Sequence, residues 1–420
     1  MDCRPIETHN RERSLAPTEA LERAFAHAAS RGISLNWRVA GRRLQSTSCD
    51  LRAADGSTTV GRGKGIGNQS VASAVYEALE HYHHLSEDIT KHIGSRSLNL
   101  AKLEEPLASA SPDLRLIGGR KEVPLTCLRF QNLQKSYHHV DIPAFLFNPD
   151  FKSENLLESE LIERLRLYRY SSNSGTASGI SLGEARLHGL LEVIERDAVG
   201  MAFVRHILAP APKPVRAIDF STIPNDLKNI LGGVKEESSS ILQLWDITSN
   251  LEIPTILCAL TTSGAAPHRF FGSGSSLSKE YALERAALEA LQGFHIQLEF
   301  GTRLQPALKR LPLSANLYHL CELRHGHFGF RGGEVLVDWH AVTSKSEHVA
   351  HQSVECHLEE ILKLLLAHGY EAFSRTILED DVCVVQVAVP QLERLFLLGE
   401  GLSVGPGPRA RSARALLAVP

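Results

Sequence analysis

The sequence lacks the features that mark nucleic-acid-binding, membrane and secreted proteins. Its net charge of −3 gives no basic field for nucleic acid, and no apolar run is long enough to span a bilayer. Residues 1–5 are not followed by the apolar segment of a secretory signal. We therefore expect a cytoplasmic protein with neither a nucleic-acid partner nor a place in a membrane.

Cysteine pairs at metal or redox spacing are also missing. The seven cysteines stand singly, and no two are separated by two residues as in a zinc ribbon. Cys258 and Cys383 lie in apolar, strand-like runs, where we expect core thiols. The histidines within 81–84 and 138–139 lack supporting ligands, so we expect them at helix ends or in loops.

Standard nucleotide-binding motifs do not occur. The stretch 63–65, Gly-Lys-Gly, lacks the earlier glycine and the Ser or Thr after lysine that a P-loop requires. No GxGxxG fingerprint follows a clear strand either. We interpret 63–65 as a flexible segment that belongs to a phosphate site of another kind.

What is present is the composition of an ordinary globular protein, 43% hydrophobic and 22% charged. We expect residues 1–60 to begin a helix near Pro17 and to continue as a polar linker. Beyond them helix-like and strand-like runs alternate, which predicts a mixed α/β (α+β) fold. Helices are expected at about 69–85, 182–205, 279–299 and 351–368, and strands at 123–130, 142–147, 241–248, 254–262 and 382–389.

Three segments repeat one pattern, in which Glu and two apolar residues are followed by Glu or Gln. They lie at 77–80, 192–195 and 289–292, each after a glycine-rich stretch. Side chains three apart on a helix project from one face, so each pair could hold a hard cation such as Mg²⁺. The distance from glycines to carboxylates varies, which makes the repeat weak.

The acidic face of the second segment extends further along its helix. Glu184 lies eleven residues before Glu195, which brings the two side chains to within about 20° around the helix axis. A solvated face is the alternative for any single pair. Apolar residues surround these pairs, however, and buried carboxylates need cations or donors.

These motifs resemble those of the YcaO proteins. Three motifs occur in the family's order: Ser-x₃-Glu-x₂-Glu at 73–80, Glu-Ala-x₃-Gly-Leu-x-Glu-x-Ile-Glu-Arg-Asp-Ala at 184–198, and Ala-Leu-x-Arg-Ala-x₂-Glu-Ala-x-Gln at 282–292. Gly-Lys-Gly at 63–65 and Pro-Gly-Pro-Arg at 406–409 are further similarities.

The resemblance implies a YcaO-type ATP-binding fold with repeated strand–helix units. It covers about residues 61–410, which would form the catalytic domain between an N-terminal segment, 1–60, and a tail, 411–420. Its cofactors would be ATP and Mg²⁺. Implied Mg²⁺ ligands are Glu77, Glu80, Glu184, Glu192 and Glu195. Implied nucleotide contacts are Lys64, Ser73, Glu184, Arg196, Arg285, Glu289 and Gln292, with catalytic roles for Arg196 and Pro420.

Three positions depart from the family's pattern. Ile180 stands where the loop before the second acidic helix often carries Asn, and Gly293 follows Gln292 where an Arg commonly comes soon after. The alternating prolines that end many azoline-forming members are represented only at 406–408 and by Pro420.

The resemblance also implies a reaction and partners. In peptide-modifying YcaO enzymes a nucleophile adds to a backbone amide carbon, ATP phosphorylates the amide oxygen and phosphate leaves. With Cys, Ser or Thr of a ribosomal precursor peptide as nucleophile, thiazoline or oxazoline forms. Thioamide or amidine formation, and a non-catalytic peptide-binding scaffold, are the alternatives.

Residues 1–60 are too short for a domain resembling ubiquitin-activating enzymes. We therefore expect a separate leader-binding protein of that kind, with a flavin-dependent dehydrogenase as a further partner.

Overall fold

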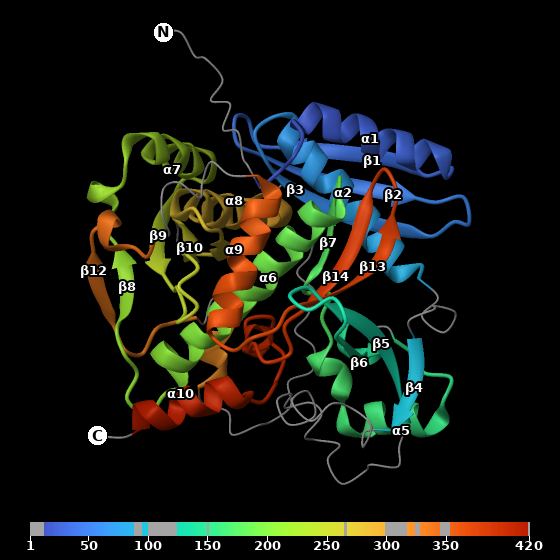
Figure 1. The fold of residues 1–420 in the computed structure, drawn as a ribbon. Coiled ribbons are helices and arrows are strands. Elements are labelled where there is room, and N and C mark those ends of the chain that lie inside the picture. The colour runs from blue at the N-terminus through green and yellow to red at the C-terminus, as the bar shows by residue number, and fades with distance from the viewer. Residues whose placement is uncertain are drawn as a thin grey trace.

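The computed structural model describes residues 12–87, 95–99, 124–148, 151–263, 267–298, 317–323, 328–344 and 353–418. Two units in it share one order: a helix, three antiparallel strands and a second helix (Figure 1). The first unit comprises α1 (Pro17–Ser30), β1 (Ser34–Ala40), β2 (Gln45–Arg52), β3 (Thr58–Gly65) and α2 (Asn68–Leu85). The second comprises α7 (Asn225–Ser238), β9 (Ser240–Asp246), β10 (Thr255–Thr262), β11 (Arg269–Ser275) and α8 (Lys279–Leu298).

Glycine in the third strand of each unit allows the following helix to pack closely on it. A Cβ on Gly63 of β3 would lie 1.9 Å from the carbonyl oxygen of Ser70 in α2. A Cβ on Gly272 of β11 would lie 2.3 Å from the carbonyl oxygen of Ala286 in α8. The stretch 63–65 is therefore a strand against a helix backbone, and our interpretation of it as a flexible segment is wrong.

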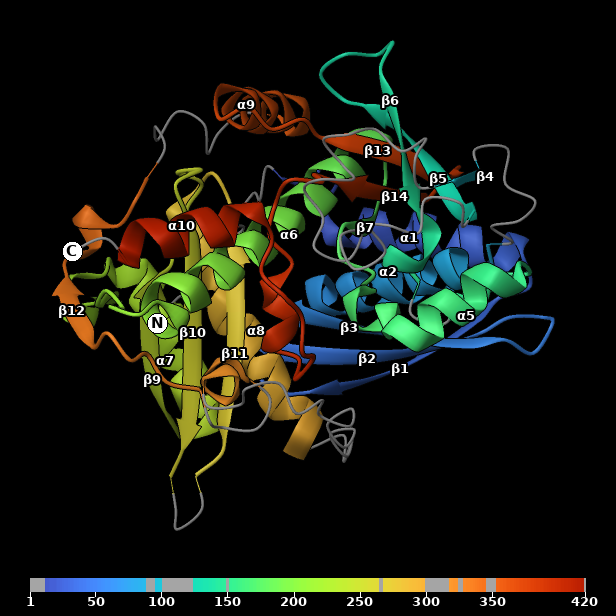
Figure 2. The ribbon, with the colours of Figure 1, turned by 90° about the horizontal axis from the view of Figure 1, so that it is seen from below.

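A third sheet and helix α6 (Leu182–Phe203) join the two units. Figure 2 shows α6 between β10 and β11 on one side and β7 and β14 on the other. The second unit's sheet continues through β8 (Val215–Ile218) to β12 (Glu334–Val337), which pairs with it in parallel. The third sheet has the order β4 (Ser95–Asn99), β5 (Pro124–Asn132), β13 (Phe373–Glu379), β14 (Cys383–Ala388) and β7 (Thr176–Gly179), with β6 (His139–Pro143) also on β5.

The expected polar linker before residue 60 is instead β1, β2 and the start of β3. Its polarity is misleading because β2 lies between two helices that supply hydrogen-bond partners. Thr47 Oγ1 lies 2.9 Å from Ser70 Oγ of α2, and Ser46 Oγ lies 2.9 Å from His295 Nδ1 of α8. Polar residues paired in this way can form a buried strand.

Most of the other expected elements are confirmed to within a few residues. The three repeat helices are α2, α6 and α8, the fourth expected helix is α9 (Val354–Ala367), and 241–248 and 254–262 pair as β9 and β10. The strand expected at 142–147 is wrong beyond Pro143, where β6 ends and a 3₁₀ turn (Ala144–Leu146) begins. Proline has no N–H to donate to a ladder, which favours that end point.

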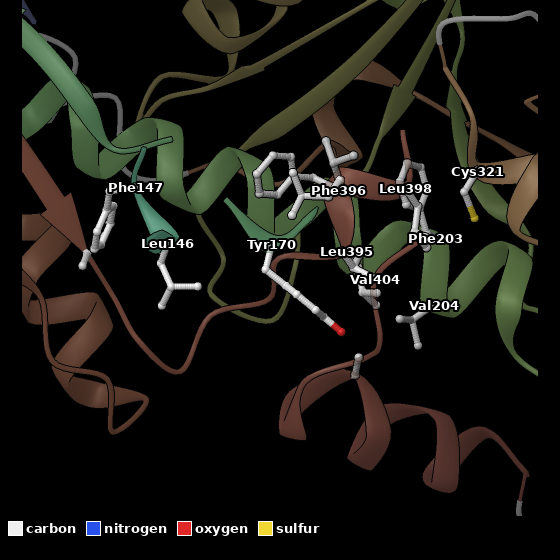
Figure 3. Close-up of a cluster of buried hydrophobic side chains, with 14 of the residues drawn as sticks. Leu146, Phe147, Tyr170, Phe203, Val204, Cys321, Leu395, Phe396, Leu398 and Val404 are labelled. Atoms are coloured by element: carbon white, nitrogen blue, oxygen red, sulfur yellow. The ribbon is translucent and has the colours of Figure 1, made fainter. Parts of the chain in front are cut away.

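A hydrophobic cluster lies below the C-terminal end of α6 (Figure 3). It brings together the π-helical turn η4 (Val204–Leu208) and the 3₁₀ turn η9 (Leu395–Leu398), and α10 (Pro408–Ala418) packs against η4. Its labelled members come from segments far apart in sequence: Leu146, Phe147, Tyr170, Phe203, Val204, Cys321, Leu395, Phe396, Leu398 and Val404. None of the described helices has both the length and the apolar character needed to cross a membrane.

Candidate active site

Helices α2, α6 and α8 lie near one another in the middle of the molecule (Figure 1), and charged side chains connect them: Glu80 of α2 interacts electrostatically with Glu192 of α6, and Glu195 of α6 lies near Arg285 of α8. On α2, Glu80 is buried and its Oε2 accepts a hydrogen bond of 3.3 Å from Ser178 Oγ of β7. Glu77 lies one turn earlier and Ser73 one turn before that, with Ser73 exposed. Three of the predicted residues thus share one face of α2.

Helix α6 contributes carboxylates to both units. The Oε1 atom of Glu195 accepts a 2.6 Å hydrogen bond from Ser273 Oγ of β11, and its Oε2 lies 3.7 Å from Arg285 Nη2 of α8. One turn earlier on α6, Glu192 Oε1 lies 3.7 Å from Arg196 Nε. The sequence places these acids at i and i+3, and the fold directs Glu195 to the second unit.

An ion pair closes the site between the two units. Lys64 at the end of β3 donates to Glu289 of α8, with 2.7 Å between Nζ and Oε2. The two residues are 225 positions apart in sequence, so no local pattern could have paired them. Lysine 64 thus remains at the site even though its stretch is a strand.

Burial and like charges shift the ionisation of these carboxylates. Burial raises the pKa of Glu80 well above its usual value, and the neighbouring Glu77 and Glu192 raise it further. Burial likewise raises the pKa of Glu192 to about 7, with Arg196 opposing the shift and Glu195 adding to it. A cation bound beside these carboxylates would therefore favour their ionised forms.

Glu289 behaves in the opposite way because cations surround it. Burial acts to raise its pKa, but Lys64, Arg196 and Arg285 together outweigh burial and lower it. The carboxylates of raised pKa on α2 and α6 therefore lie near a cluster of cations around Glu289, contributed by β3, α6 and α8. A polyanion bridged to a metal ion matches both halves of this charge pattern.

Glu184 is held by residues that the sequence analysis did not consider. Its Oε1 lies 3.1 Å from Arg13 Nη1, and its Oε2 accepts a 2.9 Å bond from the Ser14 N–H. Arg13 also lies 3.4 Å from His188 Nδ1, with Nη2 as its nearer atom. The N-terminal segment therefore lies against the acidic face of α6, and no motif in the sequence indicated that contact.

The described residues contain no group of three or more His, Cys, Asp or Glu arranged to hold a metal by themselves. Mg²⁺ in nucleotide sites takes one or two carboxylates and completes its shell with phosphate oxygens and water. Buried polar atoms fit such a ligand: among the described residues, Glu195 Oε2, Arg285 Nε and Gln292 Nε2 have no hydrogen-bond partner. The side chains thus suit Mg²⁺ that arrives with a phosphate-bearing ligand.

A surface hollow of about 390 Å³ lies elsewhere, beside α1, with Glu19, Glu22 and Arg23 among its lining residues. None of the predicted site residues lines it. The candidate active site is therefore the buried, charged cluster between α2, α6 and α8 and not this hollow. The catalytic residue predicted at Pro420 lies outside the described residues; the preceding segment is helix α10.

Comparison with known proteins identifies matching families and folds. A family model described as YcaO cyclodehydratase, ATP- and Mg²⁺-binding, matches residues 62–393. An uncharacterised protein of Methanothermobacter thermautotrophicus is 28% identical over 352 residues, which cover 81% of this chain and 83% of that protein. An uncharacterised protein in the tfuA 3′ region of Rhizobium leguminosarum bv. trifolii is 26% identical over 56% of this chain and 55% of that protein.

Solved structures with the same fold are more distant in sequence. YcaO from Methanopyrus kandleri, bound with AMPPCP and Mg²⁺, has a TM-score of 0.67 at 18% identity, covering 95% of this chain and 97% of that one. A heterocyclase in complex with substrate and cofactor has a TM-score of 0.66 at 16% identity, covering 94% of this chain. This chain spans only 55% of the heterocyclase's length. The E. coli microcin synthetase McbBCD complex has a TM-score of 0.55 at 12% identity, covering 85% of this chain and 88% of that one.

Proposed function

This chain belongs to the YcaO family, and we propose that it is an ATP- and Mg²⁺-dependent peptide cyclodehydratase. It would convert Cys, Ser or Thr of a precursor peptide to thiazoline or oxazoline. The observation that carries the proposal is that charged residues of the two units and of α6 come together: Glu80 with Glu192, Glu195 with Arg285, and Lys64 with Glu289.

The chemistry needs a better leaving group than an amide oxygen. Bound ATP supplies a phosphoryl group to that oxygen, and Mg²⁺ neutralises charge on the phosphates. In the protein, Glu77, Glu80, Glu192 and Glu195 would hold the metal. Lysine 64, Arg196 and Arg285 would bind the phosphate oxygens as charge develops.

Second-layer hydroxyls support these roles. Ser178 donates to Glu80 and Ser273 donates to Glu195, which orients each carboxylate. The Lys64–Glu289 pair holds the lysine in place at the border between the two units. These contacts position the side chains before any ligand binds, which reduces the reorganisation needed during phosphoryl transfer.

Glu184, Ser73 and Gln292 complete the proposed nucleotide contacts. Ser73 is exposed on the same face of α2 as Glu77, and the amide nitrogen of Gln292 has no hydrogen-bond partner in the described part of the chain. Glu184 is paired with Arg13, so it would exchange partners or act together with Arg13 when a nucleotide binds.

The test is reconstitution with a precursor peptide and its leader-binding protein, read by mass spectrometry and phosphate release. Ring formation should lower the peptide mass by about 18 Da per ring and release one phosphate each time. A gain of about 16 Da would instead identify the replacement of oxygen by sulfur in a thioamide. An unchanged mass with ATP, Mg²⁺ and every partner present would contradict an enzymatic role.

A separate leader-binding protein is part of this proposal. Tethering a peptide by its leader raises the concentration of its core at the active site to about the millimolar range. Turnover by the isolated chain should therefore be poor and should rise when the leader-binding protein is added.

A further inference from the structure

A buried ion pair joins α6 to the start of α10. Its partner on α6, Asp197, is the residue after Arg196. Asp197 is fully buried, and its Oδ2 lies 2.9 Å from Arg409 Nη1. Its Oδ1 accepts a hydrogen bond of 2.9 Å from the Glu393 N–H. Both oxygens of the Asp197 carboxylate are therefore held by residues from the last 30 or so positions of the chain.

Glu393 in turn holds the start of α10. Its Oε2 accepts a 2.9 Å bond from the Gly407 N–H, and its Oε1 accepts a 2.8 Å bond from the Ala410 N–H. A Cβ on Gly407 would lie 2.5 Å from Glu393 Oε1, so a larger residue there would displace the Glu393 carboxylate from its present position. The Pro-Gly-Pro-Arg sequence at 406–409 is thus built to fit this carboxylate.

Arg409 makes further contacts to two other parts of the chain. Its Nη2 lies 3.4 Å from Ser249 Oγ and also contacts Asn250 Oδ1. Its guanidinium lies over the ring of Tyr370, 5.5 Å from the centroid. We call the group of Asp197, Glu393, Gly407, Arg409 and Ala410 the C-terminal clamp.

The C-terminal clamp leads directly to the surroundings of Arg196. The 3₁₀ turn η9 follows Glu393, and its Phe396 ring lies under the Arg196 guanidinium, 5.3 Å from centroid to Cζ. Leu395 and Phe396 also pack against α6 at Gly200, where a Cβ would lie 3.2 Å from the Phe396 nitrogen. Figure 3 shows Leu395 and Phe396 beside the end of α6, with α10 below them.

We propose that Arg409 and Asp197 are positioning residues that set the orientation of Arg196. The inference rests on the proposed function, in which Arg196 contacts the nucleotide. Stability alone is a poor reason for the pair, because a buried ion pair is often no more stabilising than apolar residues of the same volume. The Asp197–Arg409 pair instead holds α6, which carries Arg196, in a fixed position relative to the Phe396 ring that contacts the Arg196 guanidinium.

A double-mutant cycle with Arg196 tests this role. Arg409→Gln should weaken Mg·ATP binding about fivefold and lower the kcat of peptide modification about tenfold, as expected for a misplaced phosphate contact. In an Arg196→Gln background the same Arg409→Gln change should have no further effect on either quantity. Arg409→Lys, which keeps the charge beside Asp197, should restore part of both.

A control at a more exposed arginine near the end of α6 separates positioning from a general loss of arginine contacts in this region. Arg331 donates to the carbonyl oxygens of Ile207 and Ala209 just beyond α6, whereas the Asp197 carboxylate is held by Arg409 and Glu393. Arg331→Gln should lower the melting temperature while leaving Mg·ATP affinity and kcat within about twofold of wild type. An equal loss of affinity in Arg331→Gln would contradict the proposal, as would an Arg409→Gln effect that is the same in both Arg196 backgrounds.

The two readouts also separate this inference from the proposed function. If the wild type binds Mg·ATP but modifies no peptide, the proposed function fails, and the affinity cycle still decides whether Arg409 acts through Arg196. If peptide modification proceeds and the affinity cycle is additive, the inference fails and the proposed function stands.

Discussion

At the scale of single residues, burial rather than residue type decides what the site carboxylates can do. Glu192 and Glu195 belong to the same turn of α6, yet Glu192 lies near Arg196 while Glu195 accepts a hydrogen bond from Ser273. Burial raises the pKa of Glu192 to about 7. Near neutral pH this carboxyl is therefore poised between its two forms, and a bound cation would favour the ionised one.

Replacing Glu192 by Gln should stabilise the metal-free protein at high pH. The pKa of this carboxyl is about 7 in the folded state and 4.5 in the unfolded state. Its contribution to the free energy of unfolding is therefore fully present below pH 4.5 and is lost as the pH rises through 7. The gain for Glu192→Gln should therefore grow across that window, on the order of 2 kcal/mol. Urea unfolding in EDTA at several pH values measures it, and a pH-independent difference would disprove the argument.

At the scale of secondary-structure elements, the contact between each third strand and its helix sets the positions of the site residues. In β11, Gly272 faces the backbone of α8, and a Cβ there would lie 2.3 Å from Ala286 O and from Ala290 N. Neither backbone atom can move without shifting Arg285 and Glu289 on the same helix. The strand–helix spacing therefore controls the site.

Gly272→Ala should lower the free energy of unfolding by at least about 2 kcal/mol, because overpacking against backbone cannot be relieved by a rotamer change. Gly232→Ala in α7 is the control, since its Cβ meets nothing within 4 Å. Alanine there should raise stability by about 0.5–1 kcal/mol through helix propensity. Equal effects of the two substitutions on thermal unfolding would refute the packing explanation.

The first and last helices of the first unit are joined by two histidines. His27 Nε2 of α1 lies 3.0 Å from His83 Nε2 of α2, and Arg31 Nη1 lies 3.2 Å from His27 Nδ1. Because arginine can only donate, His27 Nδ1 accepts and its Nε2–H donates to His83. Protonation of His83 would place two N–H groups against each other.

The pH dependence of this contact follows from burial. Burial, with His27 and Arg31 nearby, lowers the pKa of His83 from 6.5 to about 4. Its contribution to stability is therefore present above pH 6.5 and is lost as the pH falls towards 4. The stability advantage of wild type over a His83→Gln variant should shrink across that window in urea unfolding; an advantage that grows on acidification would reverse the assignment.

At the scale of the whole molecule, one ligand would bind residues from three elements that are distant in sequence. The Lys64–Glu289 and Ser273–Glu195 contacts already connect the first unit, α6 and the second unit. A ligand that binds the native state alone stabilises it by mass action. Occupation of the site should thus stabilise the protein as a unit.

Mg·ATP at 100 times its dissociation constant should stabilise the protein by about 2.7 kcal/mol. ATP in EDTA should not, because the carboxylates cannot hold a polyphosphate without a bridging cation. Glu80→Gln should abolish both this stabilisation and peptide modification, whereas Glu280→Gln, an exposed control on α8, should retain them. Stabilisation by ATP in EDTA would contradict a metal-bridged site.

Periodicity within single segments was enough to predict much of this protein. Apolar residues at helical spacing located α2, α6 and α8, and acids three apart placed Glu77 with Glu80 and Glu192 with Glu195 on common faces. The motif order indicated the YcaO family that the comparisons confirm. The helix positions and shared faces depend on neighbours within a few helical turns, and the motif order is read directly along the chain, so the sequence by itself determines both.

Only the tertiary structure decided which of those faces meet. The strands at 34–65 were missed because the hydroxyls of β2 are satisfied by α2 and α8, which are assembled from distant segments. The contacts of Glu184 with Arg13 and of Asp197 with Arg409 were likewise inaccessible, since each spans at least 170 residues. Long-range charge pairing depends on how whole units pack, and no local periodicity encodes it.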